Sequence, residues 1–251
     1  MLKSLSHLTH STVTASDGDI GKVKAAFFDD QWWTIRYLVV DTGGWLVQRE
    51  VLISPYSVKH PLGTSKNMET NLTRAAVEAS PDVDTHQPVS RQHEIQMQTY
   101  YGYPDYWEGV GVWGMNDYPL LVPGEVTEHG PLEKLPTAPD AHLRSNAKVT
   151  GYNIAAIDES IGHVQDFIFD DESWTIRYLV IDTRNWGPGG KKVLIATHWI
   201  ESIDWATNTV HVKLTRDQVK NSPEYQEEHP IVRSYEESLH ASYRRTGYWD
   251  Y

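Results

Sequence analysis

The sequence predicts a mainly β fold made of two similar small barrels, each followed by helical segments. Two observations lead to this prediction. The phrase WTIRYLVVDT at 33–42 returns as WTIRYLVIDT at 174–183, with nine identical positions of ten. Around each copy, short apolar segments alternate with turn residues. A repeat of this kind indicates one structural unit present twice.

The repetition covers most of the 251 residues. Residues 2–107 align on 143–249 at an offset of 141, which becomes 142 after one inserted residue. Residues 108–142 have no counterpart and are rich in Gly and Pro, which predicts an extended linker. The expected segments are a first barrel (1–84), its helical and aromatic appendage (85–107), the linker (108–142), a second barrel (143–226) and its appendage (227–251).

Short strands are predicted in each repeat. Residues 20–28 and 161–169 alternate apolar and polar side chains and then become apolar, which is typical of a half-buried strand. An aspartate turn follows, since Asp side chains hydrogen-bond the local backbone. Residues 34–41 have apolar side chains on both faces, which predicts a central strand. Further strands are expected at 51–54, 193–196 and 209–214.

A short helix follows the strands of each repeat. In the second repeat, Thr215 is an expected N-cap, Gln218 completes a capping box and Pro223 ends the helix. In the first repeat the cap is Thr73, but Ala76 occupies the box position. We therefore expect a weaker cap there.

A last helix is predicted at the end of each repeat. Apolar or aromatic side chains recur there at every fourth position: Val89, His93, Met97 and Tyr101 in the first repeat, and Ile231, Tyr235, Leu239 and Tyr243 in the second. Such a stripe requires burial against the barrel, the other unit or another subunit.

Four features recur in both copies: the Ile-Gly-x-Val start, the aspartate turn, the Arg-Tyr-Leu-Val-hydrophobic-Asp strand and the Val-Leu-Ile strand. Through these features, both repeats resemble the PRC-barrel domain. The family is named after the cytoplasmic domain of the photosynthetic reaction centre H subunit. The resemblance implies an adaptor-like small barrel that docks on protein partners. It implies no general catalytic motif.

Composition excludes several classes of function. Lys and Arg number 22 and Asp and Glu 34, a formal charge of −12, which disfavours nucleic acids and anionic lipid surfaces as partners. The absence of Cys excludes disulfides, thiolate metal sites and cysteine nucleophiles. The start lacks the apolar core of a signal peptide, and no apolar run is long enough to span a membrane. We expect a cytoplasmic protein, with peripheral association to a membrane complex left open.

No catalytic, cofactor-binding or metal-binding constellation is predicted. GVGVWG at 109–114 matches G-x-G-x-x-G, but it lacks the strand and helix that a dinucleotide turn requires. The acidic pairs Asp29–Asp30 and Asp170–Asp171 are expected to cap turns, with a weak divalent-ion site as the alternative. The twelve His are scattered without metal-ligand spacing.

Four charged residues of the central strands are predicted to be structural: Arg36, Asp41, Arg177 and Asp182. Each Asp closes its strand and precedes a Thr. It is expected either to pair with the Arg of the same strand or to hold the following loop by hydrogen bonds.

Aromatic residues are concentrated at 100–113 and 243–251. Tyr and Trp are common at interaction surfaces, but they also fill grooves of their own domain. The candidate interface residues are Tyr100, Tyr101, Tyr103, Tyr106, Trp107, Trp113, Tyr235, Leu239, Tyr243, Tyr248 and Trp249.

The leading hypothesis is a non-enzymatic adaptor that docks on a protein partner or associates with itself as a homo-oligomer. One alternative is a peripheral component of a photosynthetic or other electron-transfer membrane complex, which the resemblance to the H subunit suggests. The other alternative is a metal-dependent hydrolase that uses the aspartate turns.

Overall fold

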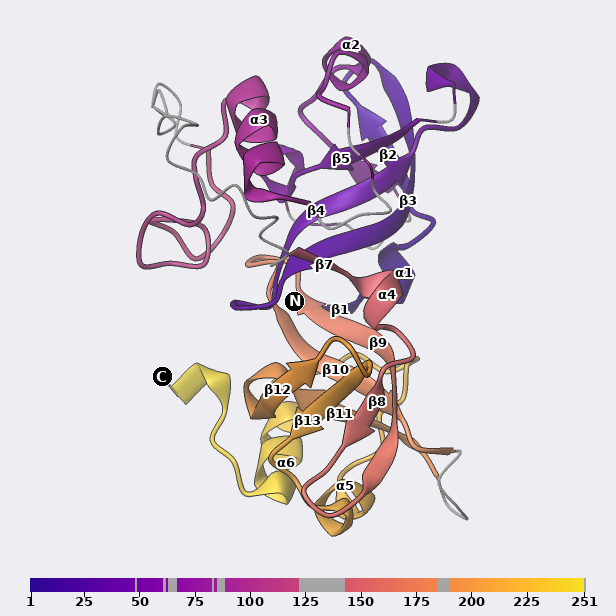
Figure 1. The fold of residues 1–251 in the computed structure, drawn as a ribbon, viewed down its shortest axis with the longest axis vertical. Coiled ribbons are helices and arrows are strands. Elements are labelled where there is room, and N and C mark those ends of the chain that lie inside the picture. Colours follow the sequence, from indigo (N-terminus) through magenta and orange to yellow (C-terminus); the bar gives the residue numbers. More distant parts are fainter. Residues whose placement is uncertain are drawn as a thin grey trace. The chain divides into compact units, whose positions relative to one another are not determined.

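The chain is mainly β in the computed structural model, with two sheets and six short α-helices among the described residues (Figure 1). The described residues are 1–47, 49–60, 62, 67–82, 84, 89–121, 143–184 and 190–250. Contacts divide the chain into two compact units. The first unit contains His7–Ala147 and Asp171–Thr175; the second unit contains Met1–Ser6, Lys148–Asp170 and Ile176–Tyr251.

The sheet of the first unit has the strand order β5-β4-β3-β2-β6, and β7 pairs with β3. The strands are β2 (Thr12–Ala15), β3 (Gly18–Asp29), β4 (Thr34–Asp41), β5 (Glu50–Ile53), β6 (Asn67–Glu69) and β7 (Leu143–Ser145). All pairs are antiparallel except β2 with β6. Every residue of β4 except the last is buried, which confirms the predicted central strand.

The sheet of the second unit has the equivalent order β11-β10-β9-β8-β13-β12, and β1 pairs with β9. Its strands are β1 (Leu2–Ser4), β8 (Asn153–Ala155), β9 (Ser160–Asp170), β10 (Ile176–Asp182), β11 (Lys192–Ala196), β12 (Ile200–Asp204) and β13 (Thr209–Val212). The sequence did not predict β1, β8 or β12, and the last predicted strand ends two residues early. Apart from these differences, the predicted strands of this repeat are confirmed.

The compact units and the sequence repeats have different bounds. Strand β1 lies in the first repeat but belongs to the second unit. Strand β7 lies in the second repeat but belongs to the first unit, as does the turn Asp171–Thr175. The repeats therefore exchange three short segments, which the predicted domain bounds did not include.

Local side-chain hydrogen bonds form the aspartate turn of the first repeat. The Asp29 carboxylate accepts from the backbone N–H of Gln31 at 2.8 Å and of Trp32 at 2.9 Å, which confirms the predicted turn. The turn ends at Trp33, whose φ is 56°, and the equivalent Trp174 has a φ of 58°. Left-handed backbone is unfavourable for a bulky residue, so burial of both indole rings must offset it.

The short helices begin where the sequence predicts. Helix α2 (Arg74–Glu78) begins after Thr73, whose side chain accepts from Ala76 N, and α5 (Arg216–Asn221) begins after a complete capping box of Thr215 and Gln218. Both predictions of capping are confirmed. Two further one-turn helices, α1 (Leu5–Leu8) and α4 (Asn146–Val149), directly follow β1 and β7.

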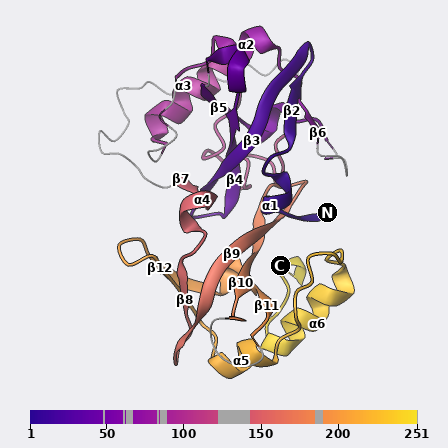
Figure 2. The same ribbon diagram turned by 90° about the vertical axis from the view of Figure 1, so that its right-hand side faces the viewer.

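The appendages form the helices α3 (Arg91–Tyr101) and α6 (Arg233–Tyr243), and α3 covers one face of the sheet of its unit (Figures 1 and 2). Met97 of α3 packs in a core with residues of β3, β4, β5 and β7. The predicted stripe is only partly correct, because His93 is half-buried whereas the polar Glu94 and Gln98 are buried.

Close backbone approach explains the glycine that both repeats have at the start of the long strand. A Cβ atom on Gly21 would lie 2.1 Å from the carbonyl oxygen of Asp41. A Cβ atom on Gly162, whose φ is 136°, would lie 2.2 Å from the carbonyl oxygen of Asp182. No side chain fits at such distances, so the Ile-Gly pair is required by the pairing of β3 with β4 and of β9 with β10.

We expect Gly162→Ala to lower the free energy of unfolding by about 2–4 kcal/mol, because it combines a backbone clash with an unfavourable φ. Gly44→Ala is the matched control, since a Cβ there meets nothing within 4 Å and we expect a change below about 0.5 kcal/mol. Urea unfolding followed by Trp fluorescence measures both. Equal midpoints for the two variants would contradict this account.

Candidate docking surface

A buried arginine connects the first sheet to the segment that follows α3. Arg36 of β4 is 1% exposed, and its Nη2 donates to Asp29 Oδ2 at 2.9 Å. Its Nη1 donates to the carbonyl oxygen of Val112. The guanidinium carbon lies 3.8 Å from the ring centroid of Tyr106 and 4.8 Å from that of Trp113. A carboxylate, a carbonyl and two ring faces thus surround the buried charge.

Of the two roles predicted for the aspartates at the strand ends, the structure shows the second, which is to hold the following loop. The expected pair of Arg36 with Asp41 is wrong, since Arg36 pairs with Asp29. Asp41 instead accepts from the backbone N–H of Gly43 at 2.9 Å. Asp182 accepts from the backbone and the guanidinium of Arg184, which holds the pKa of Asp182 down at about 2. Both aspartates therefore hold the following loop.

A buried carboxylate fixes helix α3 to the same segment. Glu94 is fully buried and accepts from the hydroxyl of Tyr106. Arg91 lies 3.2 Å from the other oxygen of Glu94 and stacks over Trp107 at 3.8 Å. Burial and the nearby Glu94 charge raise the pKa of Tyr106 well above its usual value, so Tyr106 is a neutral donor.

The second unit contains the same arrangement. The guanidinium carbon of Arg177 lies 4.3 Å from the ring centroid of Tyr248, and the hydroxyl of Tyr248 donates to Glu236 at 3.0 Å. Arg233 pairs with Glu236 at 3.1 Å and lies 4.0 Å over Trp249. We call each set of Arg, Tyr, Glu, Arg and Trp the appendage cluster. Because it recurs in both units, we assign it to holding α3 and α6 on their sheets.

The appendage cluster differs between units at one position. In the second unit, His240 replaces the aligned Gln98, and its Nδ1–H donates to the carbonyl oxygen of Thr246 at 2.8 Å. The hydroxyl of Tyr178 lies 2.9 Å from both His240 Nε2 and Glu236 Oε1, so it donates to one of them at a time. The buried His240 thus connects β10, α6 and the C-terminal segment.

A tight loop follows the first appendage. The backbone N–H of Gly111 donates to Gly114 O at 2.8 Å, and that of Trp113 donates to Asn116 O at 2.8 Å. A Cβ atom on Gly109 would lie 2.3 Å from Gly114 O, and one on Gly111 the same distance from Asn116 O. The glycines of GVGVWG therefore permit a tight backbone turn. Of the predicted linker, 122–142 lie outside the described residues.

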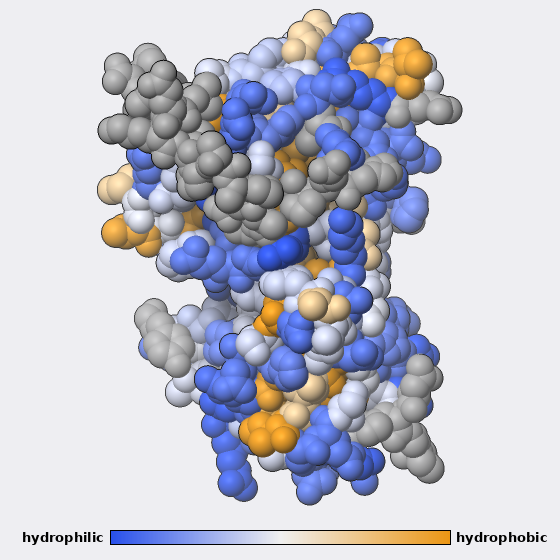
Figure 3. Space-filling model, viewed as in Figure 1, coloured by the Kyte–Doolittle hydropathy of each residue, from blue (hydrophilic) through white to orange (hydrophobic). Residues whose placement is uncertain are grey.

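Large apolar side chains are exposed on this loop. We call them the apolar loop tip: Val110 (88% exposed), Met115 (77%), Tyr118 (52%) and Leu120 (43%). Figure 3 shows hydrophobic surface on the loop that follows α3. Trp113, in contrast, is 2% exposed and donates from Nε1 to Ser173 O at 2.7 Å. The tip is thus an exposed apolar surface on a loop that the unit holds firmly.

A family model of the PRC-barrel domain matches residues 4–61 and 145–219, more than half of the chain. The chain belongs to the PRC-barrel domain family. Two matches in one chain confirm the tandem duplication. PRC-barrel domains are protein-interaction and assembly modules. A search of curated proteins found no match.

The PRC-barrel matches end before both appendages. Arg36 and Arg177 lie inside the matched ranges, whereas their partners Tyr106 and Tyr248 lie outside. The apolar loop tip also lies outside the matched ranges. The tip is therefore not part of the matched family domain.

The aromatic residues of the predicted interface mostly cover their own unit. The buried ones are Tyr103, Tyr106, Trp113, Leu239 and Tyr243. The half-buried ones are Tyr101, Trp107, Tyr235, Tyr248 and Trp249. Tyr100 is 40% exposed, and its hydroxyl donates to Ala76 O at 2.8 Å. Packing on their own sheets accounts for the buried five; an interface role for the others stays a prediction. The sequence reasoning missed Val110 and Met115, although their glycine-rich setting indicated an exposed turn.

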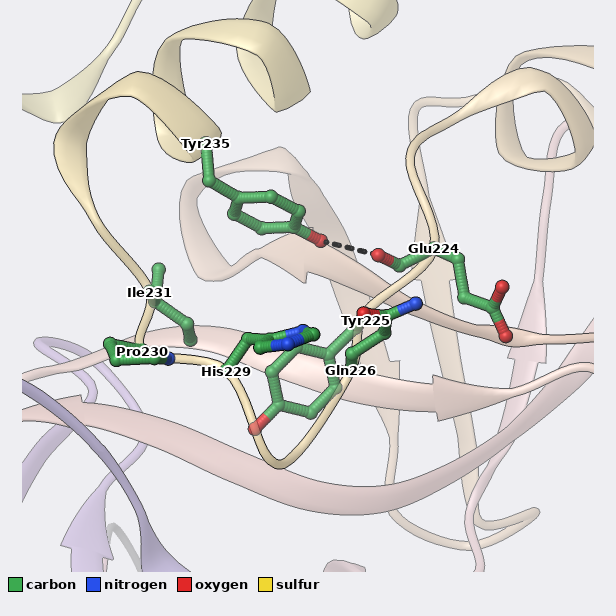
Figure 4. A pocket seen from close by; sticks show the side chains of 7 residues that line it. All are labelled: Glu224, Tyr225, Gln226, His229, Pro230, Ile231 and Tyr235. Atoms are coloured by element: carbon green, nitrogen blue, oxygen red, sulfur yellow. Dashed lines mark hydrogen bonds between the residues drawn. The ribbon is translucent and has the colours of Figure 1, made fainter.

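A hollow of about 330 Å³ lies in the second unit, beside the segment that leads from α5 into α6 (Figure 4). Its lining residues are Glu224, Tyr225, Gln226, His229, Pro230, Ile231 and Tyr235. The hydroxyl of Tyr235 donates across it to the Glu224 carbonyl at 3.3 Å. The carboxylate of Glu224 points away from the Tyr and His rings. The rings of Tyr225, His229 and Tyr235 thus line the hollow, and the carboxylate of Glu224 is directed away from them.

Within the described ranges, no three side chains of His, Asp or Glu are placed to hold a metal ion. Among the helices that the structure describes, none has the length and apolar character needed to cross a membrane.

We expect Tyr106→Phe to lower the free energy of unfolding by about 1–3 kcal/mol, because it removes the hydroxyl that donates to Oε1 of the buried Glu94. Tyr118→Phe is the matched control, since Tyr118 is 52% exposed, and it should change stability by less than about 0.5 kcal/mol. Thermal and urea unfolding measure both. If the two variants are equally stable, the hydrogen bond to Glu94 contributes nothing.

We expect stability to fall as the pH drops below about 6.5, in part through His240. Burial lowers the pKa of this side chain from 6.5, so the unfolded chain binds the proton more readily and acid favours unfolding. His240→Gln, which copies Gln98, should reduce this loss, whereas His229→Gln on an exposed loop should not. Urea midpoints between pH 5 and 8 test this. An unchanged pH slope in His240→Gln contradicts it.

Proposed function

We propose that this chain is a non-enzymatic assembly protein, in which two PRC-type barrels present the apolar loop tip to a protein partner. The observation that supports this most directly is the exposure of Val110 and Met115 on a loop that is fixed by buried contacts. An adaptor role agrees with the membership of the PRC-barrel family.

Rigidity of the loop favours binding. Trp113 is buried beneath it, the carbonyl of Val112 accepts from Arg36, and Gly114 N donates to Tyr106 O at 3.0 Å. A loop already ordered in this way loses little conformational entropy when a partner binds. Exposed apolar side chains grouped on one loop are also a common mark of protein interaction sites.

The charge around the tip indicates the chemistry of the partner. Residues 92–133 contain no Lys or Arg, and Glu108 and Asp117 are exposed beside the tip. An apolar contact with an acidic border fits a partner surface that has an apolar pocket bordered by Lys or Arg. The same charge disfavours a nucleic acid.

The charged groups of the appendage clusters support a non-enzymatic role. Arg36, Glu94 and Tyr106 are bonded to one another or to neighbouring groups of the fold. These contacts hold α3 on the sheet. We place this assembly protein in the cytoplasm, in agreement with its Cys-free composition.

A photo-crosslinking amino acid at position 110 tests the docking surface. We expect a discrete crosslinked product in the native cells, and Met115→Glu should decrease its yield at least tenfold. Position 47 is the matched control, because Val47 is 92% exposed on another loop of the same unit. The mass of the product separates a foreign partner from a second copy. No product above the yield at position 47 would falsify the proposal.

A further inference from the structure

The two sheets are completed by equivalent strands that have changed places. In the first unit, Ser145 of β7 lies opposite Phe27 of β3. In the second unit, Ser4 of β1 lies opposite Ile168 of β9. The repeats align Ser4 with Ser145 and Phe27 with Ile168. The same pairing therefore occurs twice, each time with a strand from the other repeat.

A buried carboxylate holds β1 on its sheet. The Ser4 hydroxyl donates to Asp166 Oδ2 at 2.5 Å, and the backbone N–H of Ser6 donates to Asp166 Oδ1 at 3.1 Å. Asp166 lies on β9 and is 6% exposed. The aligned residue of β3 is Ala25, which has no acceptor for a hydroxyl. This contact is therefore specific to β9.

Different groups hold β7 on the first sheet. Arg144 donates from Nε to Asp30 at 2.8 Å, and Asn146 accepts from the backbone N–H of Ala26 at 2.8 Å. Leu143 is 1% exposed and packs in the core beneath α3. The residue that aligns with Asn146 is Leu5, which cannot accept a hydrogen bond. Each sheet edge is thus built for the strand that it holds.

We propose that the edges of β3 and β9 are strand-acceptor sites, each of which selects the first strand of the opposite repeat. The ligand class is an extended Leu-basic-Ser segment followed by one helical turn. The two repeats are then obligate partners. If one repeat is removed, the sheet of the other loses a strand and is left with an open edge and unpaired backbone groups. The turn Asp171–Thr175 adds to the exchange, because Ile35 N donates to Trp174 O at 2.9 Å.

Cysteine pairs in the full chain test the exchange directly, because the chain contains no Cys. Leu2 lies opposite Asp170, close enough for a disulfide between antiparallel strands. Leu143 would be the partner of Asp170 if each strand remained in its own repeat. We expect a disulfide in Leu2→Cys/Asp170→Cys and none in Leu143→Cys/Asp170→Cys. The opposite result overturns the proposal.

Cleavage of the full chain tests whether the repeats are obligate partners. A site-specific protease sequence inserted between residues 121 and 143 allows the folded chain to be cut. Native mass spectrometry should then show both fragments in one 1:1 particle. Fragments that separate at micromolar concentration overturn the proposal.

Fragment exchange tests the selectivity of the β9 edge. The cut protein is mixed with an isotope-labelled copy, and Asp166→Ala should exchange fragments roughly tenfold faster than the unaltered pair. Asp204→Ala, which removes a carboxylate from an exposed turn of the same unit, is the matched control. If Asp166→Ala does not fold, Ser4→Ala removes the same contact from the strand. If Asp166→Ala or Ser4→Ala exchanges fragments at the same rate as Asp204→Ala, the proposed selectivity of the β9 edge is overturned.

Discussion

A buried guanidinium charge is the constraint on which the first unit depends. A charge removed from water requires compensating partners, and Arg36 obtains them from a turn carboxylate, a loop carbonyl and two aromatic rings. These partners come from three separate parts of the chain. The central strand, the aspartate turn, the appendage and the glycine-rich loop are therefore mutually dependent. Arg177 has an equivalent place in the second unit, although it is more exposed and its carboxylate is 4.0 Å away.

Local patterns in the sequence predicted most of the secondary structure. The aspartate turns and the caps at Thr73 and Thr215 depend on neighbours within three residues, so their residue types alone indicate them. The repeated strand was recognised as central because both of its faces are apolar. Six short strands were missed: β1, β2, β6, β7, β8 and β12. In β12, Ile200–Asp204 has exposed and half-buried side chains without a strong alternation.

Long-range pairing was harder to predict. Glu94 and Gln98 were placed outside the apolar stripe of α3, because polar side chains are normally exposed, yet Glu94 is buried where Tyr106 donates to it. The exchange of β1 and β7 could not be inferred from the alignment. The sequences of β1 and β7 suit either sheet equally well. The two arrangements are distinguished only by Asp166 and Asn146, because neither has a matching residue in the other repeat.

The placement of β7 and the turn Asp171–Thr175 in the first unit has a consequence for synthesis. A chain made from its N-terminus normally folds its first domain while the second is still being made. Here the first sheet lacks an edge strand until residues 143–145 have left the ribosome, and its turn contact waits for residue 175. The first repeat must therefore remain incomplete, with the edge of β3 at residues 27–29 unpaired, through the synthesis of the linker. Folding of this chain is coupled to the arrival of its second half.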